Sequence, residues 1–237
     1  MPSHALVDHD ILLKATCYDV VGDVVAHASD QGFGLAALAA ARFVLPQKIR
    51  RSNRISDKAG VASRLQQALA RVSLEEPGED EVRLAAELAD IAARQGVDLD
   101  HGEAQLLAML VRRSSPLLLT GDKRAIAAIE AVAPKAGADE AVRGKVACLE
   151  QVMRSLLRRL GAERLRAAVC REPGADRAVA NSFACASASC SEESILAGLG
   201  SYLRDLRRTA PTVMLPGEDA SGWGAQEDRV GHRELGG

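Results

Sequence analysis

Four carboxylates lie where apolar runs end or where helices are expected to begin: Asp8, Asp10, Glu103 and Asp122. The first two follow the apolar run at residues 5–7, and the last follows the run at 117–119 after one threonine and one glycine. Such runs are typical of buried parallel strands, whose carboxyl ends meet at one edge of a sheet where ligands bind. We therefore expect these carboxylates to converge.

Clustered carboxylates repel one another unless a cation neutralises them. Oxygen donors without nearby cysteine or histidine suit Mg²⁺ or Mn²⁺ rather than zinc. A metal of this kind orients water and stabilises negative charge on a phosphoryl group. We expect Asp8, Asp10, Glu103 and Asp122 to bind the metal.

Each acid also has a simpler interpretation as a helix cap. Asp100 and Glu103 fit the capping-box spacing, and Asp122 fits the residue that precedes a helix from Lys123. His9 alternates with the two aspartates, so in an extended strand it would point to the opposite face.

The expected elements alternate in a way that predicts a parallel sheet with right-handed crossovers. Strands are expected at 5–8 and 117–120, and residues 74–80 as a loop. Helices are expected at 11–29 with a break near Gly22, at 33–43, at 61–72, from Asp80 to Gly96, from Asp100 to Val111, and at 123–132. After Gly137 the pattern changes to a long amphipathic helix over 142–160 and another capped by Ser191.

Composition sets limits on function. The chain of 237 residues has a net charge of -2, so any contact with nucleic acid must be local, and 3% aromatic residues argue against base-stacking platforms. No leader or membrane-spanning run is apparent, so we expect a cytoplasmic protein. Five irregularly spaced cysteines argue against a disulfide framework.

Three segments together resemble the motifs of PIN-domain nucleases over about residues 5–135. They are Leu-Val-Asp-His-Asp-Ile at 6–11, Asp-His-Gly-Glu-Ala at 100–104, and Leu-Leu-Leu-Thr-Gly-Asp-Lys-Arg-Ala at 117–125. The resemblance implies an α/β fold, a three-layer α/β/α sandwich on a parallel sheet. It also implies Mg²⁺- or Mn²⁺-dependent cleavage of phosphodiesters, usually in RNA. Asp8, Glu103 and Asp122 match the motif acids, so the resemblance implies that these three carry catalysis.

The resemblance also suggests how the chain is organised. We expect a PIN-like nuclease domain at 1–136, a helical extension at 137–209 and a disordered tail at 210–237. RNA is the expected partner, together with an antitoxin or other protein, or a second copy in a homodimer, and no membrane. PIN nucleases commonly carry a further glutamate after the first crossover, whereas Ala36 to Arg51 contains no acid.

Basic residues lie close together in one short region, and another follows the expected strand at 117–120. Lys48, Arg50, Arg51, Arg54 and Lys123 are the candidates for contact with phosphates. A solvated helix face is the simpler interpretation of such a charge run.

Two other functions compete with the nuclease. A catalytically degenerate PIN-like module would bind RNA or protein without cleaving it. A phosphatase of the haloacid-dehalogenase type would use Asp8 and Asp10 as nucleophile and acid/base, although Ile11 and Leu12 stand where that family has glycine and threonine.

Overall fold

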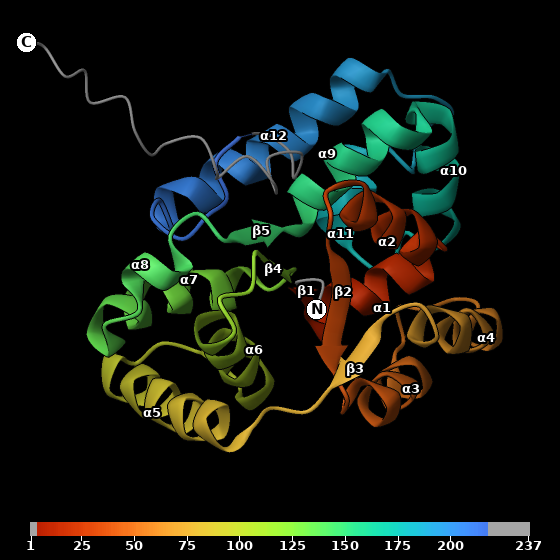
Figure 1. Ribbon diagram of the computed structural model, residues 1–237. Helices are drawn as coiled ribbons and strands as arrows, with labels where there is room; N and C mark the ends of the chain where they lie inside the picture. The colour runs from red at the N-terminus through yellow and green to blue at the C-terminus, as the bar shows by residue number, and fades with distance from the viewer. Residues whose placement is uncertain (1–3, 218–237) are drawn as a thin grey trace, which may run out of the picture.

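The computed structural model describes residues 4–217, which form a five-stranded, wholly parallel sheet between two layers of helices (Figure 1). The strand order is β3-β2-β1-β4-β5. The strands are β1 (His4–Val7), β2 (Gly34–Leu38), β3 (Ser73–Glu75), β4 (Leu118–Thr120) and β5 (Val146–Cys148). This arrangement confirms the predicted three-layer α/β/α fold. The chain crosses from β1 to β2 on one side and later returns to β4 on the other, so β1 lies at the switch point where ligands bind in such sheets.

Two hydrophobic clusters cover the faces of the sheet. One face packs against α1 (His9–Cys17), α2 (Val21–Asp30), α3 (Ala41–Arg51), α4 (Lys58–Leu69), α9 (Leu149–Leu160), α10 (Ala162–Arg171), α11 (Arg177–Ser182) and the first half of α12 (Glu192–Thr209). The other packs against α5 (Glu79–Gln95), α6 (His101–Arg112), α7 (Lys123–Val132), a 3₁₀ turn (Ala133–Ala136), α8 (Asp139–Val142) and the end of α12.

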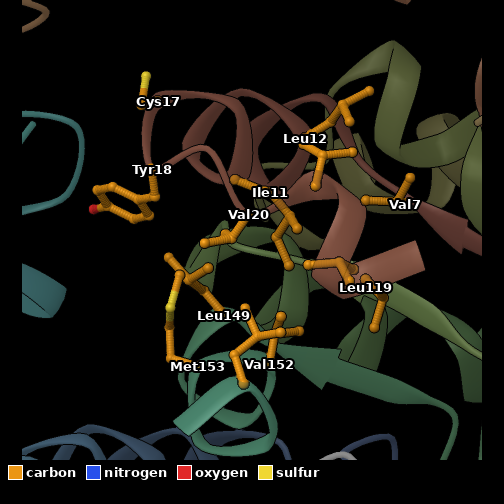
Figure 2. Packing of buried hydrophobic residues seen from close by; sticks show 14 of the residues in the cluster. Val7, Ile11, Leu12, Cys17, Tyr18, Val20, Leu119, Leu149, Val152 and Met153 are labelled. Atoms are coloured by element: carbon orange, nitrogen blue, oxygen red, sulfur yellow. The ribbon is translucent and has the colours of Figure 1, made fainter. Parts of the chain in front are cut away.

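Alternate residues of β1 belong to the two different hydrophobic clusters. Ala5 and Val7 lie in the first, and Leu6 lies in the second. Because both faces are buried, the strand is a continuous apolar run. Ile11 of α1 belongs to the first cluster together with Leu149 and Val152 of α9 (Figure 2).

The predicted helix boundaries around the acids are confirmed. Asp100 and Glu103 form a capping box at the start of α6, and Asp122 is the N-cap of α7. Gly96 ends α5 with φ at 67°, a left-handed conformation that glycine adopts without a steric penalty.

The predicted helix over 33–43 is wrong. Gly34–Leu38 forms β2, and α3 begins at Ala41 and continues through Pro46. Alanine favours helix locally, but the segment pairs with strands on both sides and is buried on both faces, so the sheet overrides propensity. The predicted loop at 74–80 likewise begins inside β3, which pairs with β2 at the edge of the sheet.

The single long helix predicted for 142–160 is also wrong. Val146–Cys148 is a strand that pairs with β4, and α9 starts at Leu149. Apolar residues recur at helical spacing through this region, so a strand of only three residues cannot be recognised from the sequence pattern. The expected helical extension therefore adds a strand to the sheet, and its helices pack into the same cores as the first 136 residues.

The start of the predicted tail packs against the protein. Met214 forms a parallel bridge with Val146, and Val213 and Met214 are buried in the second cluster. The rest of the predicted tail, from residue 218, lies outside the described residues. Within residues 4–217, no helix has both the length and the apolar character needed to cross a membrane.

One disulfide contradicts the expectation from the cysteine pattern. Cys170 at the end of α10 is bonded to Cys185, just after α11. The other three cysteines are free. Count and spacing could not reveal this pair, because α10 and α11 fold back on each other only in the tertiary structure.

Candidate functional site

A pocket of about 120 Å³ lies at the carboxyl edge of the sheet and gathers all four predicted carboxylates. Its walls come from the segments after β1 and β4, the end of β2, α3, and the start of α6. The lining residues are Asp8, His9, Asp10, Leu38, Lys48, Asp100, Gly102, Glu103, Leu106 and Asp122. The convergence expected from the sequence is therefore present in the geometry.

Asp8 joins the ends of the two central strands. Its Oδ1 accepts a hydrogen bond from Ile11 N at 2.7 Å, which caps α1. Its Oδ2 accepts from Thr120 Oγ1 at 2.5 Å and from Gly121 N at 3.2 Å. Burial, and then repulsion from Asp10, raise the pKa of Asp8 to about 6 despite these donors. The side chain is therefore firmly held but is costly to ionise.

Glu103 serves as a helix cap and also faces the pocket. Its Oε2 accepts from Asp100 N at 2.8 Å, and Asp100 Oδ1 accepts from Glu103 N at 2.8 Å. Burial, with repulsion from Asp100, Asp122 and Asp8, raises the pKa of Glu103 to about 7. Asp8 and Glu103 also line a second, smaller gap of about 10 Å³.

Asp122 is held by the residue two positions later. Its Oδ1 accepts from Arg124 N at 2.8 Å, and its Oδ2 accepts from Arg124 Nη2 at 3.0 Å. Burial opposes ionisation, but these hydrogen bonds and the charge of Arg124 lower the pKa of Asp122. Arg124 also pairs with Asp98 at 2.9 Å, outside the pocket.

Asp10 is tied to a distant part of the chain through Lys14. Lys14 Nζ donates to Asp10 Oδ2 at 2.5 Å and pairs with Asp176 Oδ2 at 2.8 Å. Burial disfavours the charge on this lysine, but the two carboxylates outweigh it and raise the pKa of Lys14. Sequence reasoning missed Asp176, which lies between α10 and α11 and carries no local signal of this role.

Gly121 leaves room for this ion pair, which gives a testable prediction. A Cβ at Gly121 would collide with Asp10 Oδ2 and lie 3.4 Å from Lys14 Nζ. We expect Gly121→Ala to lower the free energy of unfolding by about 1 kcal/mol, because it displaces a carboxylate that is hydrogen-bonded. Urea denaturation of Gly121→Ala in wild-type and Asp10→Ala backgrounds measures this. A cost that persists in full without the Asp10 carboxylate would contradict the explanation.

The predicted basic residues separate into two groups. Lys48 lines the pocket, and Arg50, Arg51 and Arg54 are exposed on α3 or the loop after it. Lys123, which was predicted to contact phosphates, has partners within the protein instead. Its Nζ pairs with Glu150 at 3.1 Å and lies 4.4 Å from the ring centre of Tyr202. The nearly buried Glu150 carboxylate needs a counter-ion, so it draws Lys123 away from the pocket.

His9 lies in the pocket, contrary to the prediction that it points away. The chain turns from strand to helix at Asp8, so the alternation of an extended strand no longer applies at residue 9. Burial and then the charge of Lys48 lower the pKa of His9. Within the described part of the chain, its Nε2 is buried without a hydrogen-bond partner.

The carboxylates share a pocket without forming a closed cage of metal ligands. Among residues 4–217, no three histidine, cysteine, aspartate or glutamate side chains are placed so that together they could hold a metal ion. Asp8, Asp10 and Asp122 each accept hydrogen bonds from protein donors. The four carboxylates offer oxygen donors, which fit a hard cation bound through one or two carboxylates and several waters, and His9 adds a nitrogen to the same pocket.

Comparison of the chain with protein-family models, curated proteins and solved structures finds no match.

Proposed function

We propose that this protein is a PIN-like, metal-dependent nuclease that cleaves phosphodiester bonds in RNA. One observation carries the proposal. Asp8, Asp10, Glu103 and Asp122 come from three separate parts of the sequence and line a single pocket at the switch point of a parallel sheet. Carboxylates gathered in this way are unfavourable unless a cation or a substrate group compensates their charge.

The proposed cofactor is Mg²⁺ or Mn²⁺. Mg²⁺ keeps several waters and is commonly bound through one or two carboxylates together with substrate phosphates, so a closed cage is not required. Asp8 and Glu103 are the proposed ligands, because both residues line the pocket and also the smaller gap of about 10 Å³. When bound, the metal would supply an activated water and would stabilise charge on the phosphoryl oxygens.

The chain's own residues position the substrate in this proposal. Thr120 and Gly121 hold the Asp8 carboxylate at the sheet edge, and Arg124 fixes Asp122. Lys48 is the cation that lines the pocket, so it is the candidate for contact with the scissile phosphate. The exposed Arg50, Arg51 and Arg54 would contact flanking phosphates. A cytoplasmic location and an antitoxin or second copy as partner belong to the same proposal.

A cleavage assay with matched variants tests this function. Purified protein is incubated with end-labelled RNA and Mn²⁺, beside Asp122→Asn and Asp98→Asn. Both aspartates pair with Arg124, but only Asp122 lines the pocket. We expect cleavage by the wild type and Asp98→Asn, and its loss in Asp122→Asn and in EDTA. Equal cleavage by all three proteins would exclude this pocket as the site. Hydrolysis of a small phosphomonoester without RNA cleavage would favour a phosphatase instead.

A second candidate is an RNA-binding module that does not cleave. It is favoured by the wall formed by α3, where Lys48 lines the pocket in a region that contains no acid. RNA binding that survives Asp122→Asn, without cleavage by any of the variants, would support this candidate.

A further inference from the structure

A groove of about 560 Å³ runs beside the carboxylate pocket, between α1 and α3. Phe43 forms much of its apolar surface, with Leu13 and Val44. The Phe43 side chain is 68% exposed. Among residues 4–217 the only other exposed large apolar residue is Val82, which is 46% exposed. Aromatic rings are usually well buried, because they carry a large apolar area.

The groove adjoins the proposed site. Lys48 lines both the groove and the carboxylate pocket, so this residue lies between them. A polymer whose phosphate contacts Lys48 would therefore have its next unit over the groove. Phe43 and Lys48 are five residues apart on α3, one and a half helical turns, so both belong to one rigid element.

The surroundings of Phe43 are basic. The guanidinium carbon of Arg42 lies 5.8 Å from the centre of the Phe43 ring, and Arg42 Nε donates to Ala39 O at 3.1 Å. Arg51 also lines the groove, and α3 contains no acidic residue. An exposed ring with cations around it matches the needs of a nucleic-acid strand, which presents flat bases and charged phosphates.

We propose that Phe43 stacks on a base of single-stranded nucleic acid whose phosphates are contacted by Lys48 and Arg51. This assignment rests on the proposed function, since it places the stacked base beside the scissile phosphate. The occupant is a nucleic acid rather than a protein segment, because the groove pairs one isolated ring with positive charge instead of a broad apolar patch. The low aromatic content of the chain is compatible with a single stacking ring.

RNA binding is measured in EDTA, which removes the metal needed for cleavage, so that it tests the proposal independently of catalysis. The probe is a fluorescein-labelled, ten-nucleotide single-stranded RNA, and affinity is measured by fluorescence anisotropy. We expect Phe43→Leu to weaken binding about tenfold, since stacking on an aromatic ring contributes this much per base or more. Phe43→Trp should retain the affinity. Val82→Ala, which alters the other exposed apolar side chain, should leave it unchanged. An oligomer whose central nucleotides are abasic should bind wild type and Phe43→Leu equally.

The outcomes separate this inference from the proposed function. RNA binding that depends on Phe43, without cleavage in the Mn²⁺ assay, would support stacking and contradict the proposed nuclease function. Cleavage with equal RNA affinity of wild type and Phe43→Leu would support the nuclease and overturn stacking. A change in oligomeric state of Phe43→Leu in analytical ultracentrifugation, with unaltered RNA affinity, would overturn it too and assign the groove to a second copy of the chain.

Discussion

Lys14→Met is expected to lower the free energy of unfolding by about 3–5 kcal/mol at pH 7, because it leaves a buried carboxylate without its partner. Lys14 is 13% exposed and pairs with Asp10 and Asp176. Asp176, at 17% exposure, cannot regain full solvation, whereas Asp10 at 35% is closer to water. Chemical denaturation at equilibrium measures the loss.

A second substitution shows whether the unpaired charge is the cause. Asp176 also caps α11 by accepting from Val179 N at 2.9 Å, and asparagine retains this acceptor. We therefore expect Lys14→Met/Asp176→Asn to recover most of the stability lost in Lys14→Met. A double variant as unstable as the single one would instead point to lost packing of the lysine stem.

The cost should also depend on pH. Burial opposes the charge of Asp176, but Lys14 outweighs it and lowers the pKa of Asp176 below 3.8. A depressed folded-state pKa contributes stability that is present above the unfolded value and is lost as the pH falls through the folded value. The difference between wild type and Lys14→Met is therefore expected to shrink below pH 3.8.

Glu103→Gln is expected to stabilise the metal-free protein at pH 8 by about 1–2 kcal/mol. The pKa of Glu103 is raised from 4.5 to about 7, and each pKa unit corresponds to about 1.4 kcal/mol. Partial exposure of this side chain reduces the effect through solvent screening. Glutamine can still accept the hydrogen bond from Asp100 N, so the helix cap is retained.

The pH dependence of this effect has a definite sign. Between pH 4.5 and about 7 the folded protein binds more protons at Glu103 than the unfolded chain does, so stability falls as the pH rises through this window. We expect no difference between wild type and Glu103→Gln at pH 4, and the full difference at pH 8. Thermal unfolding in metal-free buffer over this range tests it, and a constant difference at all pH values would contradict it.

Metal addition provides an independent readout for the same variant. Mn²⁺ is expected to raise the Tm of the wild type at pH 8 and to have little effect at pH 5, where Asp8 and Glu103 are largely protonated. Glu103→Gln should lose most of this response. An equal rise in both proteins would place the metal elsewhere.

Local sequence signals were sufficient to predict the ends of helices, where a single residue determines the backbone conformation. Asp100, Asp122 and Gly96 defined the ends of helices because capping depends on one side chain or one dihedral angle. The apolar runs before Asp8 and Asp122 identified two central strands, since only a strand buried on both faces is apolar throughout. Those features predicted the fold class and the meeting of the acids at one edge.

Tertiary context decided the rest. The segment 34–38 contains two alanines among five residues, and only its neighbours β1 and β3 make it a strand. The strand β5 is hidden inside a helical pattern. Asp176 reaches Lys14, and Thr120 reaches Asp8 across 112 residues, by folding of the whole chain. Whether the four acids bind metal stays a prediction.

The ion pair between Lys14 and Asp176 has a consequence for synthesis of the protein. Asp8 leaves the ribosome well before its partner Thr120, and the segment with Asp176 follows later still. Contacts of such sequence separation form slowly, and chains emerge from the N-terminus first. A nascent chain ending near residue 136 would have β4 as an edge strand, paired with β1 but not yet with β5, and Lys14 without Asp176. The pocket therefore reaches its final form only after the segment around Asp176 has been synthesised.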